Sequence, residues 1–186
     1  MDRQAGRLLD LLAGASRRGE FVLSSGKKSD FYLNGKLVTL TTEGLDLVAR
    51  LLLPRVRAHG ATAVGGPSPG ADPMVGALGV HAFREGVPLS LFFVRKEAKG
   101  HGTGQRVEGP PIPDGARVVL IEDVVTSGAS LLSAVEAVRE AYPCQVVATI
   151  CLVDREEGGT EALARAGAPL ESLFRRRDLE GRLPHP

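Results

Sequence analysis

The chain has 186 residues, of which 43% are hydrophobic and 24% charged, and its formal net charge is +1. This length suits one compact domain with a real core, and the composition excludes a disordered or fibrous protein. The balanced charge argues against a dedicated nucleic-acid binder, although a local basic stripe could survive within it.

The N-terminal third predicts two helices around a small antiparallel element. Apolar residues at helical spacing predict an amphipathic helix over residues 2–13. Thr41 begins a second helical pattern, which keeps one apolar face up to about residue 58. Between the helices, the strand-like runs 21–23 and 31–33 are separated by turn-forming residues and should pair with each other.

From residue 61 onward, short apolar runs alternate with helical stretches. Runs so nearly continuous in Val, Ile and Leu are typical of parallel strands covered on both faces, with the helices as crossovers. We expect strands at 61–64, 89–94, 118–121 and 146–153, and helices at 74–83, 129–141 and 160–166. The predicted fold class is therefore α/β, and the tail from Arg175 gives no sign of a second domain.

The ends and the cysteines add two further expectations. The first residues do not resemble an export signal, and no apolar run approaches the roughly 18 residues of a membrane helix, so we expect a cytoplasmic protein. Cys144 and Cys151 match no common zinc, redox or haem spacing, and we expect buried thiols rather than ligands.

Two adjacent carboxylates, Glu122 and Asp123, follow the apolar run 118–121. The segment Thr126–Ser130 then opens a helix, and free backbone N–H groups at such a helix start favour an anion. In an open α/β sheet this turn lies at the carboxyl ends of the strands, where ligands bind. The carboxylates could hold ribose hydroxyls and, directly or through water, Mg²⁺. The plainer alternative is that the two acids only cap the turn.

A second motif places the cations Arg95, Lys96, Lys99 and His101 within seven residues, interleaved with glycines. It begins the stretch 95–116, which is longer than a compact domain usually tolerates as a loop. Cations on such a tether predict a lid that stabilises an anionic leaving group and excludes water. The alternative is an ordinary solvated basic loop.

These motifs resemble those of a known family. The order of strand, two acids, two apolar residues and Thr-Ser-Gly over 118–130 resembles the phosphoribosyl pyrophosphate signature of the type I phosphoribosyltransferases. The run Arg-Lys-Glu-Ala-Lys-Gly-His-Gly is similar to the catalytic loop of the branch of that family whose acceptor base is orotate. Residues 21–32 and 153–155 resemble the orotate-side segments of the same branch, so the similarity extends from about residue 20 to 157.

The resemblance implies a type I phosphoribosyltransferase fold, with a central, mostly parallel sheet flanked by helices. Within a single domain over 1–186, about residues 1–35 and the C-terminal tail would form a small hood over the active site. The implied enzyme is a pentosyltransferase that moves the 5-phosphoribosyl group from phosphoribosyl pyrophosphate to orotate in pyrimidine (UMP) biosynthesis, giving orotidine 5′-monophosphate and pyrophosphate. It further implies Mg²⁺ as cofactor and a homodimer in which the lid serves the neighbouring subunit.

Carried over residue by residue, the resemblance implies three groups of contacts. Pyrophosphate would bind Arg95, Lys96, Lys99 and His101, and ribose 5-phosphate would bind Glu122, Asp123, Val124, Val125, Thr126, Ser127, Gly128, Ala129 and Ser130. Orotate would contact Thr126 and Arg155. Phe31 and Tyr32, in the N-terminal orotate-side segment, would be further contacts. The implied catalytic residues are Lys99, His101 and Asp123, with His101 either a proton donor or a hydrogen-bond donor.

The sequence departs from the family pattern at two places. Some members have Lys where Ser24 stands and Tyr-Lys where Pro69-Gly70 stand, so two pyrophosphate contacts are missing, for which Lys27 or Lys28 could substitute. The glycine-rich loop 65–72 could offer backbone amides to an anion, or it could be only a tight strand-to-helix turn.

Two other functions stay open. A phosphoribosyltransferase for a purine or another base would share residues 118–130 but would need neither the 95–104 motif nor Arg155, which could simply pair with Asp154 or Glu156. A non-catalytic regulator could use the fold to sense phosphoribosyl pyrophosphate and bind RNA or DNA. No Gly-Lys-Thr or Gly-Lys-Ser follows a glycine-rich run, which disfavours a nucleoside triphosphatase.

Overall fold

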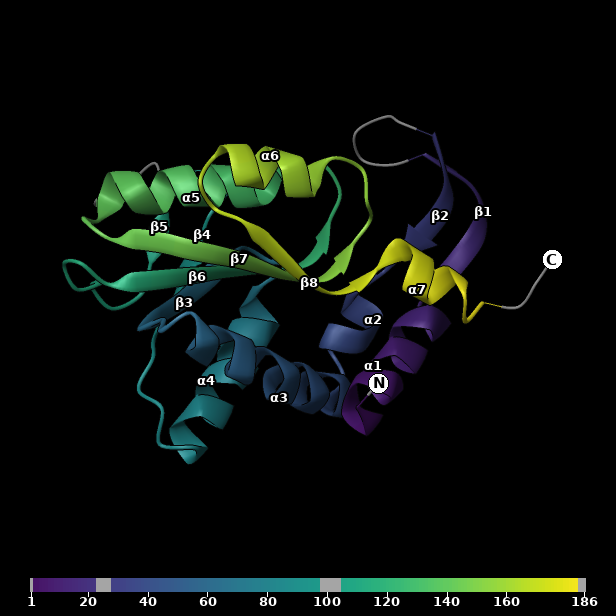
Figure 1. Ribbon diagram of the computed structural model, residues 1–186, viewed down its shortest axis with the longest axis horizontal. Coiled ribbons are helices and arrows are strands. Elements are labelled where there is room, and N and C mark those ends of the chain that lie inside the picture. The colour runs from purple at the N-terminus through teal and green to yellow at the C-terminus, as the bar shows by residue number, and fades with distance from the viewer. Residues whose placement is uncertain (1, 23–27, 98–104, 184–186) are drawn as a thin grey trace.

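The computed structural model describes residues 2–22, 28–97 and 105–183 of the chain. A six-stranded sheet in the order β5-β4-β3-β6-β7-β8 forms its centre (Figure 1). The strands are β3 (Ala63–Pro67), β4 (Ser90–Val94), β5 (Val107–Glu108), β6 (Arg117–Val125), β7 (Gln145–Asp154) and β8 (Leu170–Arg175). All neighbours pair in parallel except β4 and β5, so the predicted α/β class with a mostly parallel sheet is confirmed.

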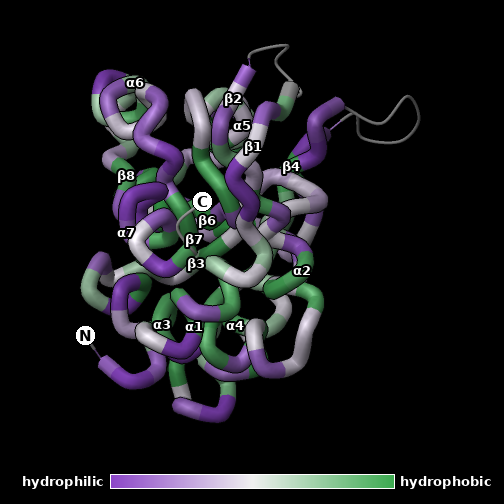
Figure 2. Tube along the Cα trace, turned by 90° about the vertical axis from the view of Figure 1, so that its right-hand side faces the viewer, coloured by the Kyte–Doolittle hydropathy of each residue, from purple (hydrophilic) through white to green (hydrophobic). Residues whose placement is uncertain are grey.

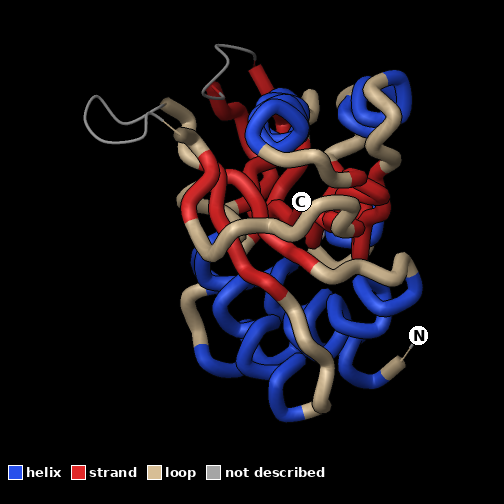
Figure 3. The backbone as a smooth tube through the Cα atoms, turned by 90° about the vertical axis from the view of Figure 1, so that its left-hand side faces the viewer, coloured by secondary structure: helices blue, strands red, loops and turns tan. Residues whose placement is uncertain are grey.

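Helices cover both faces of this sheet (Figure 1). On one face lie α3 (Thr42–Ala58) and α4 (Asp72–Arg84), with α1 (Arg3–Gly14) packed beside α3. On the other lie α5 (Ala129–Ala141) and α6 (Gly159–Arg165). Each face has its own apolar cluster, which is why the central strands are apolar on both sides. The central strands are accordingly largely hydrophobic in the colours of Figure 2. Figure 3 shows the strands as a layer between the helices.

The N-terminal hairpin forms a separate two-stranded sheet of β1 (Ser16–Val22) and β2 (Lys28–Leu33). The predicted antiparallel element is confirmed, but β1 begins earlier than expected, at Ser16, and residues 31–33 pair with residues 16–18 rather than with 21–23. The short helices α2 (Lys36–Thr39) and α7 (Arg176–Glu180) lie next to it (Figure 1). Nη2 of Arg176 lies 2.5 Å from Oδ1 of Asp30, so an ion pair ties the C-terminal part of the chain to the hairpin.

Two expectations about boundaries were wrong. The acid pair Glu122 and Asp123 does not end its strand, because β6 continues to Val125 through pairing with β7. The stretch 95–116 is not all loop, because β5 pairs with β4 and both Val107 and Ile112 are buried. Periodicity could not reveal a two-residue strand, since its pairing depends on a neighbour distant in the sequence.

The remaining expectations concerned the two cysteines and membrane-spanning segments. Cys151 is buried and Cys144 half-buried, and loss of water around each thiol raises its pKa above the ordinary value. Across residues 2–22, 28–97 and 105–183, none of the helices has the length and apolar character needed to cross a membrane.

Candidate active site

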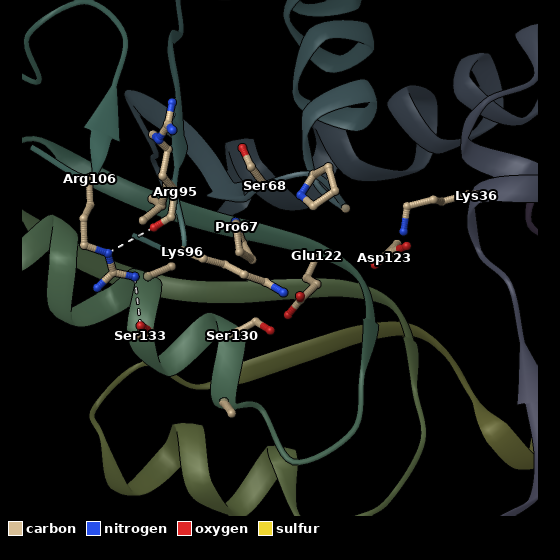
Figure 4. Close-up of a pocket in the computed structure, with 15 residues that line it drawn as sticks. Lys36, Pro67, Ser68, Arg95, Lys96, Arg106, Glu122, Asp123, Ser130 and Ser133 are labelled. Atoms are coloured by element: carbon tan, nitrogen blue, oxygen red, sulfur yellow. Dashed lines mark hydrogen bonds between the residues drawn. The ribbon is translucent and has the colours of Figure 1, made fainter. Parts of the chain in front are cut away.

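A cavity of about 390 Å³ opens at the carboxyl ends of β3, β4 and β6 (Figure 4). Its described lining comes from six parts of the chain: Lys36; Pro67, Ser68, Pro69 and Gly70; Val94, Arg95 and Lys96; Arg106; Glu122 and Asp123; and Ala129, Ser130, Ser133 and Ala134. The position follows from the fold, since parallel strands end at one edge of the sheet and the loops after them enclose a common space.

Two glycines in β3 allow this strand to pack closely against the neighbouring strands β4 and β6. A Cβ atom at Gly66 would lie 2.1 Å from the carbonyl oxygen of Ile121 in β6, and one at Gly65 would lie 2.4 Å from the ring of Phe92 in β4. The loop 67–70 is a tight strand-to-helix turn, in which the Ser68 hydroxyl donates to Oδ1 of Asp72 at 2.7 Å. Whether the loop also holds an anion stays a prediction.

The acid pair lies on the floor of the cavity. Oδ1 of Asp123 accepts a hydrogen bond from the backbone N–H of Val124 at 2.9 Å. The same carboxylate is flanked by backbone that lacks side chains, because a Cβ at Gly70 would lie 2.8 Å from Oδ1 and one at Gly35 would lie 3.1 Å from Oδ2. A side chain at Gly70 would therefore force the Asp123 carboxylate to shift, and one at Gly35 would crowd it.

Burial raises the pKa of Glu122 to about 8, and repulsion from the neighbouring Asp123 adds to the effect. A hydrogen bond from Ser130 and the positive charge of Lys96 act in the opposite direction. At neutral pH Glu122 is therefore mainly protonated in the folded chain, and a cationic ligand in the cavity would drive it to release that proton.

This pKa predicts a dependence of stability on pH. Between about pH 4.5 and pH 8 the unfolded chain loses the Glu122 proton while the folded chain keeps it, so the free energy of unfolding falls as the pH rises. The slope from this one group is at most about 1.4 kcal/mol per pH unit. Glu122→Gln should remove that slope, as measured by urea unfolding across this range. Parallel curves for the two proteins would show that Glu122 titrates normally.

The described cations of the basic motif line another part of the cavity wall. Arg95 and Lys96 lie in the cavity, and Nη1 of Arg95 is 3.1 Å from Oε1 of Glu108. Arg106 donates to the carbonyl oxygen of Arg95 at 3.0 Å and to the Ser133 hydroxyl at 2.9 Å. Lys99 and His101 belong to the same motif but lie outside the described residues.

The predicted phosphate cradle lies beside the acids. Helix α5 begins at Ala129, after Gly128 with φ 78°, and both Ala129 and Ser130 line the cavity with Glu122 and Asp123. Gly128 is required because this left-handed conformation is unfavourable for other residues. Thr126, by contrast, is half-buried and does not line this cavity.

Arg155 connects the end of β7 to the N-terminal hairpin. Its Nη2 donates to the Ser29 hydroxyl at 2.8 Å and to the carbonyl oxygen of Phe31 at 3.1 Å, and its Nε lies 3.0 Å from Oε1 of Glu157. The alternative pairing with Asp154 or Glu156 does not occur in the structure, and the acid that Arg155 meets is Glu157.

The two aromatic residues of the base segment point in different directions. Phe31 is fully buried, with the guanidinium carbons of Arg155 and Arg176 at 5.8 Å and 5.2 Å from its ring centroid. Tyr32 is 41% exposed and packs against Phe21, with ring centroids 5.3 Å apart.

Sequence reasoning missed two cations of the cavity, Lys36 and Arg106. Neither belongs to a motif, so no local signal distinguishes them from other surface cations. Only the packing of α2 against the acid pair, and of the segment around β5 against α5, brings them to the cavity.

The sheet order, the acid pair and the adjoining helix start define a phosphoribosyltransferase. In agreement with this, residues 41–166 match the model of the phosphoribosyl transferase domain, and the chain belongs to this family, within it to the orotate phosphoribosyltransferases. It is 49% identical to the orotate phosphoribosyltransferase of Thermosynechococcus vestitus over 178 residues, which cover 95% of this chain and 93% of that protein. The resemblance in residues 95–102 and 118–130 is thus confirmed at the level of the family.

Solved structures agree with this placement. The orotate phosphoribosyltransferase of Mycobacterium tuberculosis H37Rv in complex with Fe(III) dicitrate is 34% identical with a TM-score of 0.80, covering 95% of this chain and 98% of that one. The same enzyme in complex with 5-phospho-α-D-ribosyl 1-diphosphate is 30% identical with a TM-score of 0.78, covering 95% and 99%.

Proposed function

We propose that the chain transfers the 5-phosphoribosyl group from phosphoribosyl pyrophosphate to N1 of orotate, releasing pyrophosphate and forming orotidine 5′-monophosphate in pyrimidine biosynthesis. One observation carries the proposal: a single cavity joins the acid pair Glu122 and Asp123, the start of α5 and the cations Arg95 and Lys96. These groups match the three parts of the donor, which are a ribose with free hydroxyls, a 5′-phosphate and a pyrophosphate.

The chemistry requires no covalent nucleophile on the enzyme. Breaking the bond at the anomeric carbon develops positive charge on the ribose and negative charge on the leaving pyrophosphate, so cations positioned at the pyrophosphate lower the barrier. Arg95 and Lys96, with Lys99 and His101 of the same motif, are the proposed groups. Asp123 would hold the ribose hydroxyls, and alignment of the base with the anomeric carbon would lower the barrier further.

Mg²⁺ fits the cavity as part of this proposal. Among the described residues no group of three or more His, Cys, Asp or Glu side chains could hold a metal, whereas two carboxylates, Glu122 and Asp123, face the cavity. Mg²⁺ commonly binds one or two carboxylates, water and substrate phosphates together. Such an ion would neutralise charge on the pyrophosphate, and this chain would contribute only the carboxylates.

Recognition of orotate is proposed for Arg155 and Thr126. The planar guanidinium of Arg155 matches a carboxylate, and its contacts with Ser29 and the Phe31 carbonyl hold it at the edge of the hairpin. Phe31 would thus act partly through its backbone, with Tyr32 on the exposed side. The hairpin and the C-terminal tail together would form the hood of one domain.

A homodimer in the cytoplasm completes the proposal. Several large apolar side chains are exposed on the described surface, namely Leu37, Leu40, Val80, Phe83 and Phe93. Val80 and Phe83 lie three residues apart on α4 and therefore share one face, and Phe83 is 85% exposed. Covering such side chains is a usual reason for subunits to associate.

The direct test is pyrophosphate release from phosphoribosyl pyrophosphate with orotate, with and without Mg²⁺. Turnover with orotate, and little with adenine, hypoxanthine or uracil, is the expected result. Turnover with one of those bases but not with orotate would favour the phosphoribosyltransferase for another base. Filter binding of RNA and DNA at modest salt tests the regulator, for which we expect no retention.

A further inference from the structure

The cavity contains a cation that belongs to neither recognised motif, Lys36 at the start of α2. Figure 4 shows its amino group directed toward the Asp123 carboxylate, from the side opposite to Lys96. Arg95 and Lys96 belong to the basic motif and Arg106 follows it in the chain, whereas Lys36 follows the N-terminal hairpin. Among the described lining residues, positively charged side chains therefore lie on two sides of the acid pair Glu122 and Asp123.

The backbone around Lys36 is held in place. Gly35 is buried and packs against Asp123, where a Cβ atom would lie 3.4 Å from the Asp123 Cβ and 3.5 Å from Cγ2 of Val124. On the other side of Lys36, Val38 and Thr39 are buried and anchor α2 to α3. The Lys36 side chain itself is exposed, so it starts from a fixed point beside Asp123 and extends into the cavity.

The packing around Asp123 explains why the cation is Lys36, next to Gly35, and not a residue of the 67–70 loop. Some family members place a Lys where Gly70 stands, but here a Cβ at Gly70 would lie 2.8 Å from Oδ1 of Asp123. Lysine at that position would require the carboxylate to move. Gly35 and Gly70 flank one carboxylate, so a side chain that follows Gly35 reaches the space next to Gly70.

We propose that Lys36 is a substrate-binding residue that contacts the pyrophosphate of the donor, in place of the cation absent at Gly70. This inference depends on the proposed donor, phosphoribosyl pyrophosphate. The leaving pyrophosphate carries several negative charges, which cations on two walls neutralise better than cations on one, and Lys36 supplies the charge on the wall away from Lys96. Pairing with Asp123 alone is the competing role, since it would hold the acid without touching the donor.

The test measures binding of inorganic pyrophosphate with Mg²⁺ by calorimetry, together with the kinetics of both substrates. Lys36→Ala should weaken pyrophosphate binding and lower kcat/KM for phosphoribosyl pyrophosphate about tenfold, as expected for one charge-assisted contact. The KM for orotate should stay within about twofold, and Lys36→Arg should restore most of the affinity. Arg84→Ala, an exposed cation at the end of α4 and away from the cavity, is the matched control.

Three results would overturn the inference. Lys36→Ala could bind pyrophosphate as the unmodified chain does, or Lys28→Ala could show the loss instead. In an Asp123→Asn background, Lys36→Ala could have no further effect, which would reduce Lys36 to a partner of Asp123. Unchanged melting temperatures would show that the variants fold.

The outcomes separate this inference from the proposed function. Orotate turnover with pyrophosphate binding that is indifferent to Lys36 would overturn only the role of Lys36. Lys36-dependent pyrophosphate binding without orotate turnover would overturn only the acceptor. A chain that binds no pyrophosphate at all would overturn both.

Discussion

Replacing Lys99 by alanine should lower kcat by about 10²–10³, the usual loss when one group that stabilises developing charge is removed. Lys99 follows the cavity residues Arg95 and Lys96 in the same motif, and the proposed mechanism places it on the leaving pyrophosphate. The measurement is steady-state turnover with orotate and phosphoribosyl pyrophosphate. A single-turnover experiment should show that the chemical step, rather than product release, has slowed.

Two further variants sharpen this prediction. Arg84→Ala removes an exposed cation far from the cavity and should turn over normally. If the lid serves the neighbouring subunit, mixing Lys99→Ala with an inactive Asp123→Ala chain should restore part of the activity, because hybrid dimers contain one intact site. No recovery after verified subunit exchange would argue against shared sites, and an unchanged rate for Lys99→Ala would remove Lys99 from the mechanism.

Gly66→Ala should destabilise the fold by about 3 kcal/mol or more, the largest stability effect that we expect from a single methyl group. The new Cβ would lie 2.1 Å from the Ile121 carbonyl oxygen and 2.5 Å from the Ala71 Cβ. Neither contact can be relieved by rotating a side chain, so β3 would have to separate from β6. The measurement is urea unfolding, and the wider separation of β3 from β6 should also disturb the cavity.

Gly76 provides the matched control for this substitution. It lies inside α4, and a Cβ there would meet nothing within 4 Å. Gly76→Ala should therefore be neutral or stabilise the chain by up to about 1 kcal/mol, since alanine favours the helix. Equal unfolding midpoints for the Gly66 and Gly76 variants would show that the sheet tolerates a side chain at position 66.

Local pattern was enough to predict most of the elements. The strands β3, β4, β6 and β7 and the helices α3, α4 and α5 coincide with the expected apolar runs and helical faces within a few residues. The failures were the shortest or least regular elements, α2, β5, β8 and α7. Each is too short, or too weakly apolar, for periodicity to register before tertiary contacts are known.

The sequence by itself determined the α/β class, the acid pair and the helix start at α5 that we propose binds phosphate, because these depend on residues adjacent in the chain. Only the tertiary structure decided which distant residues meet them. It brought Lys36 and Gly70 to the Asp123 carboxylate and Arg155 to Ser29, and it raised the pKa of Glu122 by burying it. The physical reason is that a parallel sheet gathers strand ends at one edge whatever their separation in sequence.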